Sequence, residues 1–269
     1  MVKDSPAQIR RPLVFIPTYN EKDNAPKLFS EIQALGLDLD ILFIDDNSPD
    51  GTGEILQILS KSHSQLHVVN RNGKLGIGSA HLEGIHWAYQ HGYQTLITMD
   101  CDFTHHPSKI FDILRAAQGG TEDIVVGSRY LQKGSLTGWN LIRRFLTYAG
   151  HFATKTFLNI PYDATGGFRL YKLNQIPQDS FHLITSRGYS FFFESLYFLH
   201  LSGLKVREIP ITLPPRTYGH SKMDFGEIKR SIQLLFTLYI RTILSREKYL
   251  KTKPSPSNEL EQSYQDDRN

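Results

Sequence analysis

The first half of the chain alternates short apolar runs with stretches of helical periodicity, and this alternation constrains the fold more than any other feature. Each apolar run ends in residues that favour turns. The apolar runs lie at residues 13–16, 41–44, 66–69, 95–99 and 123–126, and the helical stretches at 25–35, 52–62, 79–90 and 107–118. Strands that alternate with helices predict an α/β fold with a mainly parallel central sheet and helices on both faces.

The second half is less regular and contains more aromatic residues. The pattern predicts helices at 141–158 and 191–201, strands at 166–171 and 206–211, and a long amphipathic helix at about 225–250. Residues 251–269 are polar and contain Pro and Ser, which is typical of disorder. We therefore expect a single domain over residues 1–250 that ends in the amphipathic helix, followed by a disordered tail.

Charge is divided unevenly along the chain, although the formal net charge is only +3. Residues 1–125 hold 10 Lys and Arg against 16 Asp and Glu, whereas residues 126–250 hold 17 against 7. This asymmetry suggests that one half handles cations and the other handles anions, although a chance distribution over a solvated surface is the alternative. The single cysteine, Cys101, excludes a disulfide framework and a Cys-rich zinc site, and it favours a reducing compartment.

Polar clusters follow three of the predicted strands, at residues 17–21, 45–46 and 100–102. Because ligands of open α/β sheets lie at the carboxyl ends of the strands, we expect these clusters to share one edge. Carboxylates gathered there repel one another unless a cation or hydrogen-bond donors lie among them. Asp100 and Asp102 form a D-x-D pair with two hard oxygen ligands, which suits Mg²⁺ or Mn²⁺ bridging a diphosphate. Such a pair alone is weak evidence, and its position after an apolar strand strengthens it.

The residues in these clusters resemble a known family. PTYNE at 17–21, DDNSPDGT at 45–52 and MDCDFTHHP at 99–107 are similar to motifs of the family 2 glycosyltransferases. Within that family the chain most resembles the dolichyl/polyprenyl-phosphate mannose synthases. The resemblance continues through GSRY at 127–130, TGGFRLY at 165–171, GYSF at 188–191 and RTYGHSK at 216–222, and it covers about residues 12–245.

The resemblance implies a GT-A fold, the Rossmann-like fold of nucleotide-diphospho-sugar transferases, with GDP-mannose as donor and a polyprenyl (dolichyl) phosphate as acceptor. The positions implied to hold guanosine are Pro17, Tyr19, Glu21, Ile44 and Asp46. Those implied to contact the diphosphate and a Mg²⁺ or Mn²⁺ ion are Asp100, Asp102 and the main chain of Cys101, with Thr104 as a third metal ligand. The donor phosphates would be held by Arg129, Arg216 and Lys222, and the acceptor phosphate by Arg143 and Thr147. Asp100, Asp102 and Arg129 are the expected catalytic residues.

Elementary chemistry agrees with this assignment. The second pKa of a phosphate monoester lies near 6, so the acceptor is already an anionic nucleophile at neutral pH and needs no dedicated base. Basic residues must then screen two anionic substrates, and a metal ion must stabilise the leaving diphosphate. The arginine fork suits phosphate because it donates two hydrogen bonds. In-line attack at the sugar carbon would invert the anomer and give a β-linked mannosyl phosphate from an α-linked donor.

Other interpretations stay open for several residues. Arg143 could belong to a merely solvated helix face, and Arg169 could form a structural ion pair or bind a ligand. Glu194 could be a buried ion-pair member or part of the active-site wall. His105 is expected to cap or pack its loop because it lacks the partners of a zinc site. Phe192 stands where relatives often have Gln, which puts sugar or acceptor contacts there in question.

Two alternatives to mannosyl transfer also stay open. One is a polyprenyl-phosphate glycosyltransferase that uses a UDP-hexose donor, and the other is a nucleotide-binding module without turnover. No segment reaches the roughly 20 apolar residues of a membrane span, and the first apolar run is too short for a signal peptide. We expect a cytoplasmic protein bound peripherally to the cytoplasmic face of a membrane. The C-terminal helix could contact lipid, a small membrane-anchoring subunit or its own domain. No nucleic-acid partner is expected.

Overall fold

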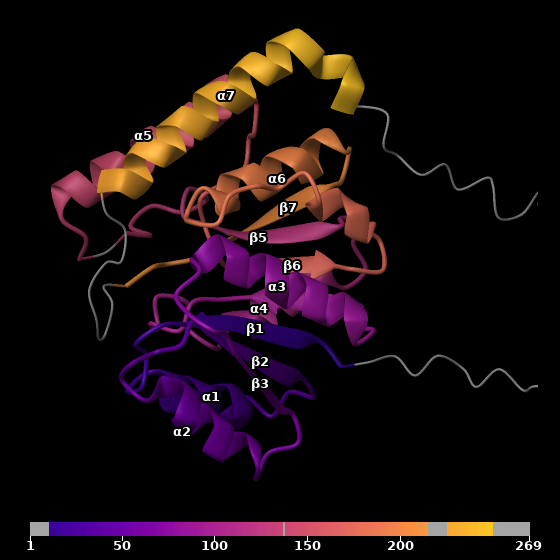
Figure 1. The fold of residues 1–269 in the computed structure, drawn as a ribbon. Helices are drawn as coiled ribbons and strands as arrows, with labels where there is room; N and C mark the ends of the chain where they lie inside the picture. The colour runs from indigo at the N-terminus through magenta and orange to yellow at the C-terminus, as the bar shows by residue number, and fades with distance from the viewer. Residues whose placement is uncertain (1–10, 137, 215–224, 250–269) are drawn as a thin grey trace, which may run out of the picture.

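The computed structural model describes residues 11–136, 138–214 and 225–249 (Figure 1). The first half contains β1 (Leu13–Thr18), α1 (Ala25–Ala34), β2 (Asp40–Asp45), α2 (Thr52–Ser60), β3 (Leu66–Asn70), α3 (Ile77–Gln90), β4 (Thr95–Thr98), α4 (Lys109–Ala117) and β5 (Ile124–Ser128). The second half contains α5 (Leu141–Leu158), β6 (Arg169–Lys172), the 3₁₀ helix η1 (Gln178–Phe181), α6 (Phe191–Leu201), β7 (Val206–Pro210) and α7 (Phe225–Tyr249). The expected tail at 251–269 lies outside the described residues.

The strands form one seven-stranded sheet in the order β3-β2-β1-β4-β6-β5-β7. Strand β6 runs antiparallel to both of its neighbours, and the other pairs are parallel. The predicted α/β fold with a mainly parallel sheet is therefore confirmed. The insertion of β6 between β4 and β5 was not predicted, because nothing local in a four-residue strand encodes its partners.

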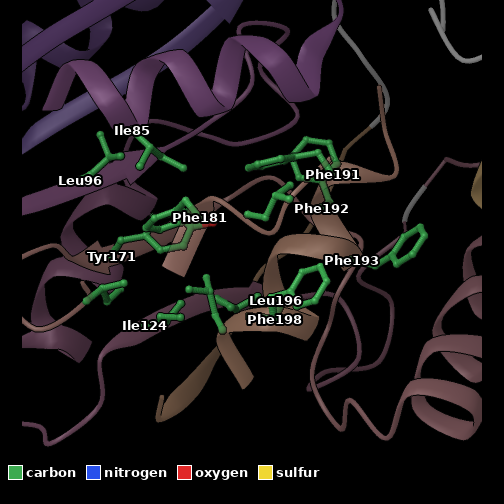
Figure 2. Close-up of a cluster of buried hydrophobic side chains, with 14 of the residues drawn as sticks. Ile85, Leu96, Ile124, Tyr171, Phe181, Phe191, Phe192, Phe193, Leu196 and Phe198 are labelled. Atoms are coloured by element: carbon green, nitrogen blue, oxygen red, sulfur yellow. The ribbon is translucent and has the colours of Figure 1, made fainter. Parts of the chain in front are cut away.

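The two faces of the sheet bury separate hydrophobic clusters. One cluster joins α3 and α6 to the sheet, and the other joins α1 and α4 to the opposite face. Figure 2 shows the first cluster, in which side chains of α6 meet Tyr171 of β6 and Phe181 of η1. Helix α6 is buried around almost its whole circumference, from Phe191 to Leu199, which explains why its sequence is apolar with little periodicity.

Helices α5 and α7 lie side by side at one end of the molecule, beyond α6 (Figure 1). Phe157 of α5 packs against Phe236 and Tyr239 of α7, with ring centroids 5.8 and 5.3 Å apart. Both helices also carry large apolar side chains that are exposed. Among the described helices, none combines the length and hydropathy that crossing a membrane requires.

Candidate active site

A cavity of about 370 Å³ opens where β1, β2 and β4 end, which is the edge at which α/β sheets bind ligands. The structure brings together seven of the eleven residues that the resemblance assigns to the donor. They are Pro17, Tyr19, Glu21, Asp46, Asp100, Cys101 and Asp102. Ile44 is instead buried in the core at 0% exposure and lies outside the cavity lining. Arg216 and Lys222 lie outside the described residues.

The loop after β1 is fastened to the loop after β2. The N–H groups of Asn20 and Glu21 donate to the hydroxyls of Ser48 and Thr52, each at 2.9 Å. Asn20 has a φ of 54°, a left-handed conformation that Asn adopts more readily than most residues. These bonds place Glu21 at the cavity and explain why turn-forming residues follow both strands.

Adjacent Asp45 and Asp46 have different roles. Asp45 is buried and accepts hydrogen bonds from Thr18 and Ser48, so it holds the two loops together. Asp46 faces the cavity and forms an ion pair with Arg71 at 2.5 Å. Its other carboxylate oxygen accepts the N–H groups of residues 75 and 76, each at 3.1 Å. Asp46 therefore fixes the Gly-rich loop at 73–78 against the cavity.

The fixed loop contributes Lys74 to the cavity wall, a residue to which the motifs assign no role. Its Nζ lies 4.5 Å from the ring centroid of Tyr19. Among the described residues that line the cavity, Lys74 alone carries a positive charge. Gly76 of the same loop also lines the cavity and has a φ of +97°. A Cβ at this position would lie 2.5 Å from the carbonyl oxygen of Arg187. Glycine is thus required for the close approach of this loop to the 185–189 loop.

Asp100 and Asp102 follow β4 in a tight turn. The N–H of Asp100 donates to Nδ1 of His105 at 3.1 Å, and the His105 ring stacks on Phe168. Thr104 donates to Oδ1 of Asp102 through its N–H at 3.1 Å and its hydroxyl at 2.5 Å. The conformation of both carboxylate-bearing residues is therefore set by the residues that follow them, and His105 packs the loop as expected.

The residues present fit a divalent cation. Asp100 and Asp102 both line the cavity, and carboxylate oxygens are the ligands that Mg²⁺ and Mn²⁺ prefer. Thr104, the expected third ligand, is buried, lies outside the cavity lining and orients Asp102. Within the described ranges, no three or more His, Cys, Asp or Glu side chains gather around a common metal position. Two carboxylates are a usual protein contribution to Mg²⁺ when substrate phosphates supply further oxygens.

Arg129 is buried and forms a two-pronged ion pair with Asp163. Its Nε lies 2.7 Å from Oδ2 and its Nη2 lies 2.5 Å from Oδ1. Nη2 also donates to Thr165, which lines the cavity, whereas Arg129 itself does not. Burial is the largest influence and would raise the pKa of Asp163, but the Arg129 guanidinium and the hydrogen bonds from the N–H groups of residues 129 and 165 together hold this pKa below its ordinary value. In this structure Arg129 thus joins the loop after β5 to the loop before β6, directly behind the cavity wall.

Two other buried charges support the wall. Arg169 donates hydrogen bonds to the carbonyls of residues 164, 166 and 192 and to the hydroxyls of Tyr171 and Ser195. Glu194 accepts two N–H groups and one hydroxyl from residues 185 and 186. Among the described residues, Glu194 and Arg169 neither line the cavity nor form an ion pair with each other or with another side chain: Glu194 holds the backbone at 185–186, and Arg169 holds backbone carbonyls.

Helix α7 completes the wall with Glu227, which no sequence motif singles out. Its Oε2 accepts the N–H of Tyr189 at 3.1 Å, and both residues line the cavity. A Cβ on Gly188 would crowd this carboxylate, so the glycine of the GYSF motif leaves room for it. Glu227 and Asp163 lie far from the strand-end motifs in sequence, and no local pattern marks them.

The residues implied to hold the acceptor phosphate lie on α5, apart from the cavity lining. Thr147 donates its hydroxyl to the Arg143 carbonyl at 2.9 Å, one turn earlier. The Tyr130 hydroxyl donates to the Thr147 carbonyl at 3.1 Å. Because Tyr130 is the neighbour of Arg129, this bond ties α5 to the segment behind the cavity wall.

A model of the family described as "Glycosyl transferase family 2" matches residues 13–187. A polyprenol monophosphomannose synthase from Mycolicibacterium smegmatis is 33% identical over 248 residues, which cover 90% of this chain and 93% of the relative. An undecaprenyl-phosphate mannosyltransferase from Micrococcus luteus is 32% identical over 223 residues, which cover 82% and 91%. The chain belongs to glycosyltransferase family 2.

Solved structures agree on the fold of this glycosyltransferase. A mannosyl-3-phosphoglycerate synthase from Rubrobacter xylanophilus superposes with a TM-score of 0.62 at 18% identity, covering 92% of this chain and 78% of that one. A mannosyltransferase from Pyrobaculum calidifontis, in complex with GDP-Man and Mn²⁺, gives a TM-score of 0.51 at 13% identity, covering 97% and 81%. The GT-A fold and the resemblance to polyprenyl-phosphate mannose synthases are therefore confirmed.

Proposed function

We propose that this glycosyltransferase moves mannose from GDP-mannose to a polyprenyl or dolichyl phosphate and releases GDP. The cavity carries this proposal, because it gathers residues from three strand ends at the positions that the family resemblance assigns to a nucleotide-sugar donor. The names of the two relatives support both the mannosyl group and the polyprenyl phosphate acceptor. GDP as the nucleotide rests on the match at residues 17–21 and 45–46 and on the neighbour solved with GDP-Man.

A Mg²⁺ or Mn²⁺ ion would be held by Asp100 and Asp102 together with the donor diphosphate. When bound, such an ion offsets negative charge on the leaving diphosphate. The chain's own residues prepare the site for it: Thr104 fixes the Asp102 carboxylate, and His105 fixes the main chain at Asp100. The neighbour solved with Mn²⁺ supports this choice of ion.

The acceptor phosphate is placed by Arg143 and Thr147 in this proposal. No residue is assigned as a general base, because the phosphate is already anionic at neutral pH. Attack from the side of the sugar opposite the diphosphate would invert the anomeric centre. Lys74 and the proposed phosphate ligands Arg216 and Lys222 would offset the charge of two anionic substrates that approach each other.

The proposed location is the cytoplasmic face of a membrane, because α5 and α7 present apolar side chains to the surface. Exposed fractions reach 80% at Leu141, 74% at Ile142 and 71% at Phe145 on α5, and 76% at Leu244 on α7. Contiguous exposed apolar residues mark interaction surfaces, and a polyprenyl acceptor resides in lipid. A small membrane-anchoring subunit on α7 is the alternative occupant.

A donor screen tests the proposed function. Purified protein is incubated with Mg²⁺ or Mn²⁺, undecaprenyl phosphate and either GDP-mannose or a set of UDP-hexoses, and the lipid product is identified by mass. We expect lipid-linked mannose with GDP-mannose only. A hexose product formed from a UDP donor would replace the mannose assignment, and GDP or UDP binding without any product would favour a binding module.

Asp102→Asn tests the metal site in the same assay. We expect transfer to fall at least about 100-fold, because a carboxylate ligand beside the leaving diphosphate becomes neutral. Asp112→Asn is the matched control, since Asp112 is a half-buried α4 residue that pairs with Lys109 and lies outside the cavity lining. Unchanged transfer in Asp102→Asn would refute the metal assignment while leaving the donor assignment to the screen.

A further inference from the structure

Trp139 lies directly before α5, and its indole contacts Arg143. The guanidinium carbon of Arg143 lies 3.5 Å from the centroid of the Trp139 ring. At this distance an edge-on guanidinium would drive its nitrogens into the ring, so the two planar groups must meet face to face. Stacking uses the face of the guanidinium, whereas its hydrogen bonds to phosphate are made in the plane. The two interactions are therefore geometrically compatible.

The indole is anchored while the start of α5 faces outward. Trp139 is partly buried against the cluster that includes Leu136 and Phe168. The neighbouring helix residues Leu141 and Ile142 are 80% and 74% exposed. The Trp139 ring is thus a partly buried surface at the start of a helix whose first turn exposes its apolar side chains.

The indole N–H indicates which property of Trp139 matters. Nε1 is buried and has no hydrogen-bond partner in the part of the chain that the structure describes. A buried tryptophan that is kept for its polar group normally bonds its N–H. Within the described residues, the ring is therefore held by packing against the core, and its contact with a charged group is the stacking on Arg143.

The backbone of Arg143 is held as firmly as its side chain. The side chain of Asn140, at the N-cap of α5, accepts the Arg143 N–H at 2.8 Å. The Thr147 hydroxyl donates to the Arg143 carbonyl at 2.9 Å. Cap, helix turn and indole together determine where the guanidinium lies relative to the Thr147 hydroxyl.

We propose that Trp139 is a positioning residue for the acceptor phosphate, acting by stacking on Arg143. The inference rests on the proposed function, because it takes Arg143 as a phosphate ligand. Without the indole face, the long arginine side chain would lose its preferred orientation and bind the acceptor phosphate less well. Donor binding, which occurs in the separate cavity, would be unaffected.

The test is a double-mutant cycle with Trp139→Leu and Arg143→Gln, read as separate KM values for undecaprenyl phosphate and GDP-mannose. We expect Trp139→Leu to raise the acceptor KM about three- to tenfold, the range of a partly exposed cation–π contact, and to leave the donor KM unchanged. Trp139→Phe, which keeps an aromatic face, should restore most of the loss. In the Arg143→Gln background, Trp139→Leu should add less than about twofold.

The possible results distinguish the positioning role of Trp139 from the assignment of Arg143 as a phosphate ligand. An equal effect of Trp139→Leu in both backgrounds, or a matching rise in donor KM, would overturn the positioning role and leave Arg143 as a phosphate ligand. An unchanged acceptor KM in Arg143→Gln would overturn the phosphate assignment and the inference with it. Tryptophan fluorescence gives a binding measurement that does not depend on turnover. In the variant Trp87→Phe, Trp139 is the only tryptophan of the chain. Its fluorescence should then change on titration with undecaprenyl phosphate, and no change would contradict the proposal.

Discussion

At the scale of single residues, buried charges are the most consequential side chains of this glycosyltransferase. Arg129 has a carboxylate partner in Asp163, whereas Arg169 donates its hydrogen bonds to carbonyls and hydroxyls. Both arginines lie next to the cavity wall rather than within it. An arginine in a family motif therefore does not necessarily bind the ligand. The groups that it contacts in the structure determine its role.

Asp163→Asn is expected to lower the free energy of unfolding by about 3–5 kcal/mol at pH 7, because it leaves the Arg129 charge buried without its counter-charge. Denaturant titration measures the loss. The Asp163 pKa lies below its ordinary value of 3.8, so this stabilisation is present above about pH 4 and is lost as the pH falls further. The control is Asp179→Asn, because the Asp179 side chain is 90% exposed. This substitution should leave the free energy of unfolding unchanged. Equal stability of both variants would contradict the buried-pair account.

His81→Leu is expected to remove part of the acid sensitivity of the fold. Burial against Phe15, Phe191 and Phe192, aided by the positive charge of Arg169, lowers the His81 pKa from 6.5 to about 3. Between pH 6.5 and about pH 3, His81 is therefore protonated in the unfolded chain and neutral in the folded protein. The free energy of unfolding consequently falls as the pH drops below 6.5. From pH 7 to pH 5 the wild type should lose about 2 kcal/mol more than His81→Leu.

Chemical denaturation at the two pH values measures this difference. The control is His86→Gln on the same helix, because His86 is exposed and changes its surroundings little on folding. Parallel pH profiles for His81→Leu and the wild type would show that His81 does not carry the effect.

At the scale of elements, the start of α3 is pressed against the loop at 185–189. A Cβ on Gly78 would lie 2.7 Å from the carbonyl oxygens of residues 186 and 188 and from Cβ of Phe191. These are backbone atoms and a helix-bound side chain, which cannot move aside easily. The Gly-rich turn at 73–78 is thus a packed part of the cavity wall.

Gly78→Ala is expected to destabilise the fold by about 1–3 kcal/mol through overpacking and to raise the donor KM by displacing the cavity wall. Gly150→Ala, in the middle of α5, is the matched substitution, because no atom lies within 4 Å of its added Cβ. It should stabilise the protein by about 0.5–1 kcal/mol. Thermal unfolding and donor kinetics distinguish the two variants. If Gly78→Ala proved as stable as Gly150→Ala, tight packing at Gly78 would be excluded.

Helix and strand positions in the first half follow the predicted runs closely, with shifts of a few residues at the ends. For example, α4 begins at Lys109 after Pro107, and β4 ends at Thr98 before the acidic turn. Local sequence determines such elements, because strands buried on both faces are continuous apolar runs and the buried faces of helices recur about every 3.6 residues. It does not determine the partners of β6, whose order in the sheet depends on contacts far along the chain.

At the scale of the whole molecule, the apolar face of α5 and α7 lies at the opposite end from α2 (Figure 1). The double variant Ile142→Gln with Phe145→Gln is expected to weaken binding to phosphatidylglycerol-containing vesicles at least about tenfold, because two exposed apolar side chains no longer enter the lipid. Vesicle co-sedimentation measures the binding. Ile58→Gln on α2 alters a side chain that is 65% exposed at the other end and should bind like the wild type.

Salt separates the two contributions to this binding. An apolar contact persists in high salt, whereas attraction of the basic half to anionic lipid is screened. Wild-type binding that disappears in about 0.5 M NaCl, together with full binding by the double variant, would assign the membrane contact to charge alone.

The sequence by itself determined the fold class, the three strand-end clusters and their family, because these depend on local periodicity and on short runs of residues. It correctly predicted that Asp100, Asp102 and Asp46 share one edge of the sheet. It did not foresee that Asp46 fastens a loop.

Only the tertiary structure decided which residues share a contact across long separations. It paired Arg129 with Asp163, brought Glu227 of α7 into the cavity wall, and exposed the apolar face of α5. Even the stacking of Arg143 on Trp139, four residues away, depends on how the chain enters α5 from the core. The physical reason is that hydrogen bonds and ion pairs are set by three-dimensional packing, which neither composition nor periodicity encodes residue by residue.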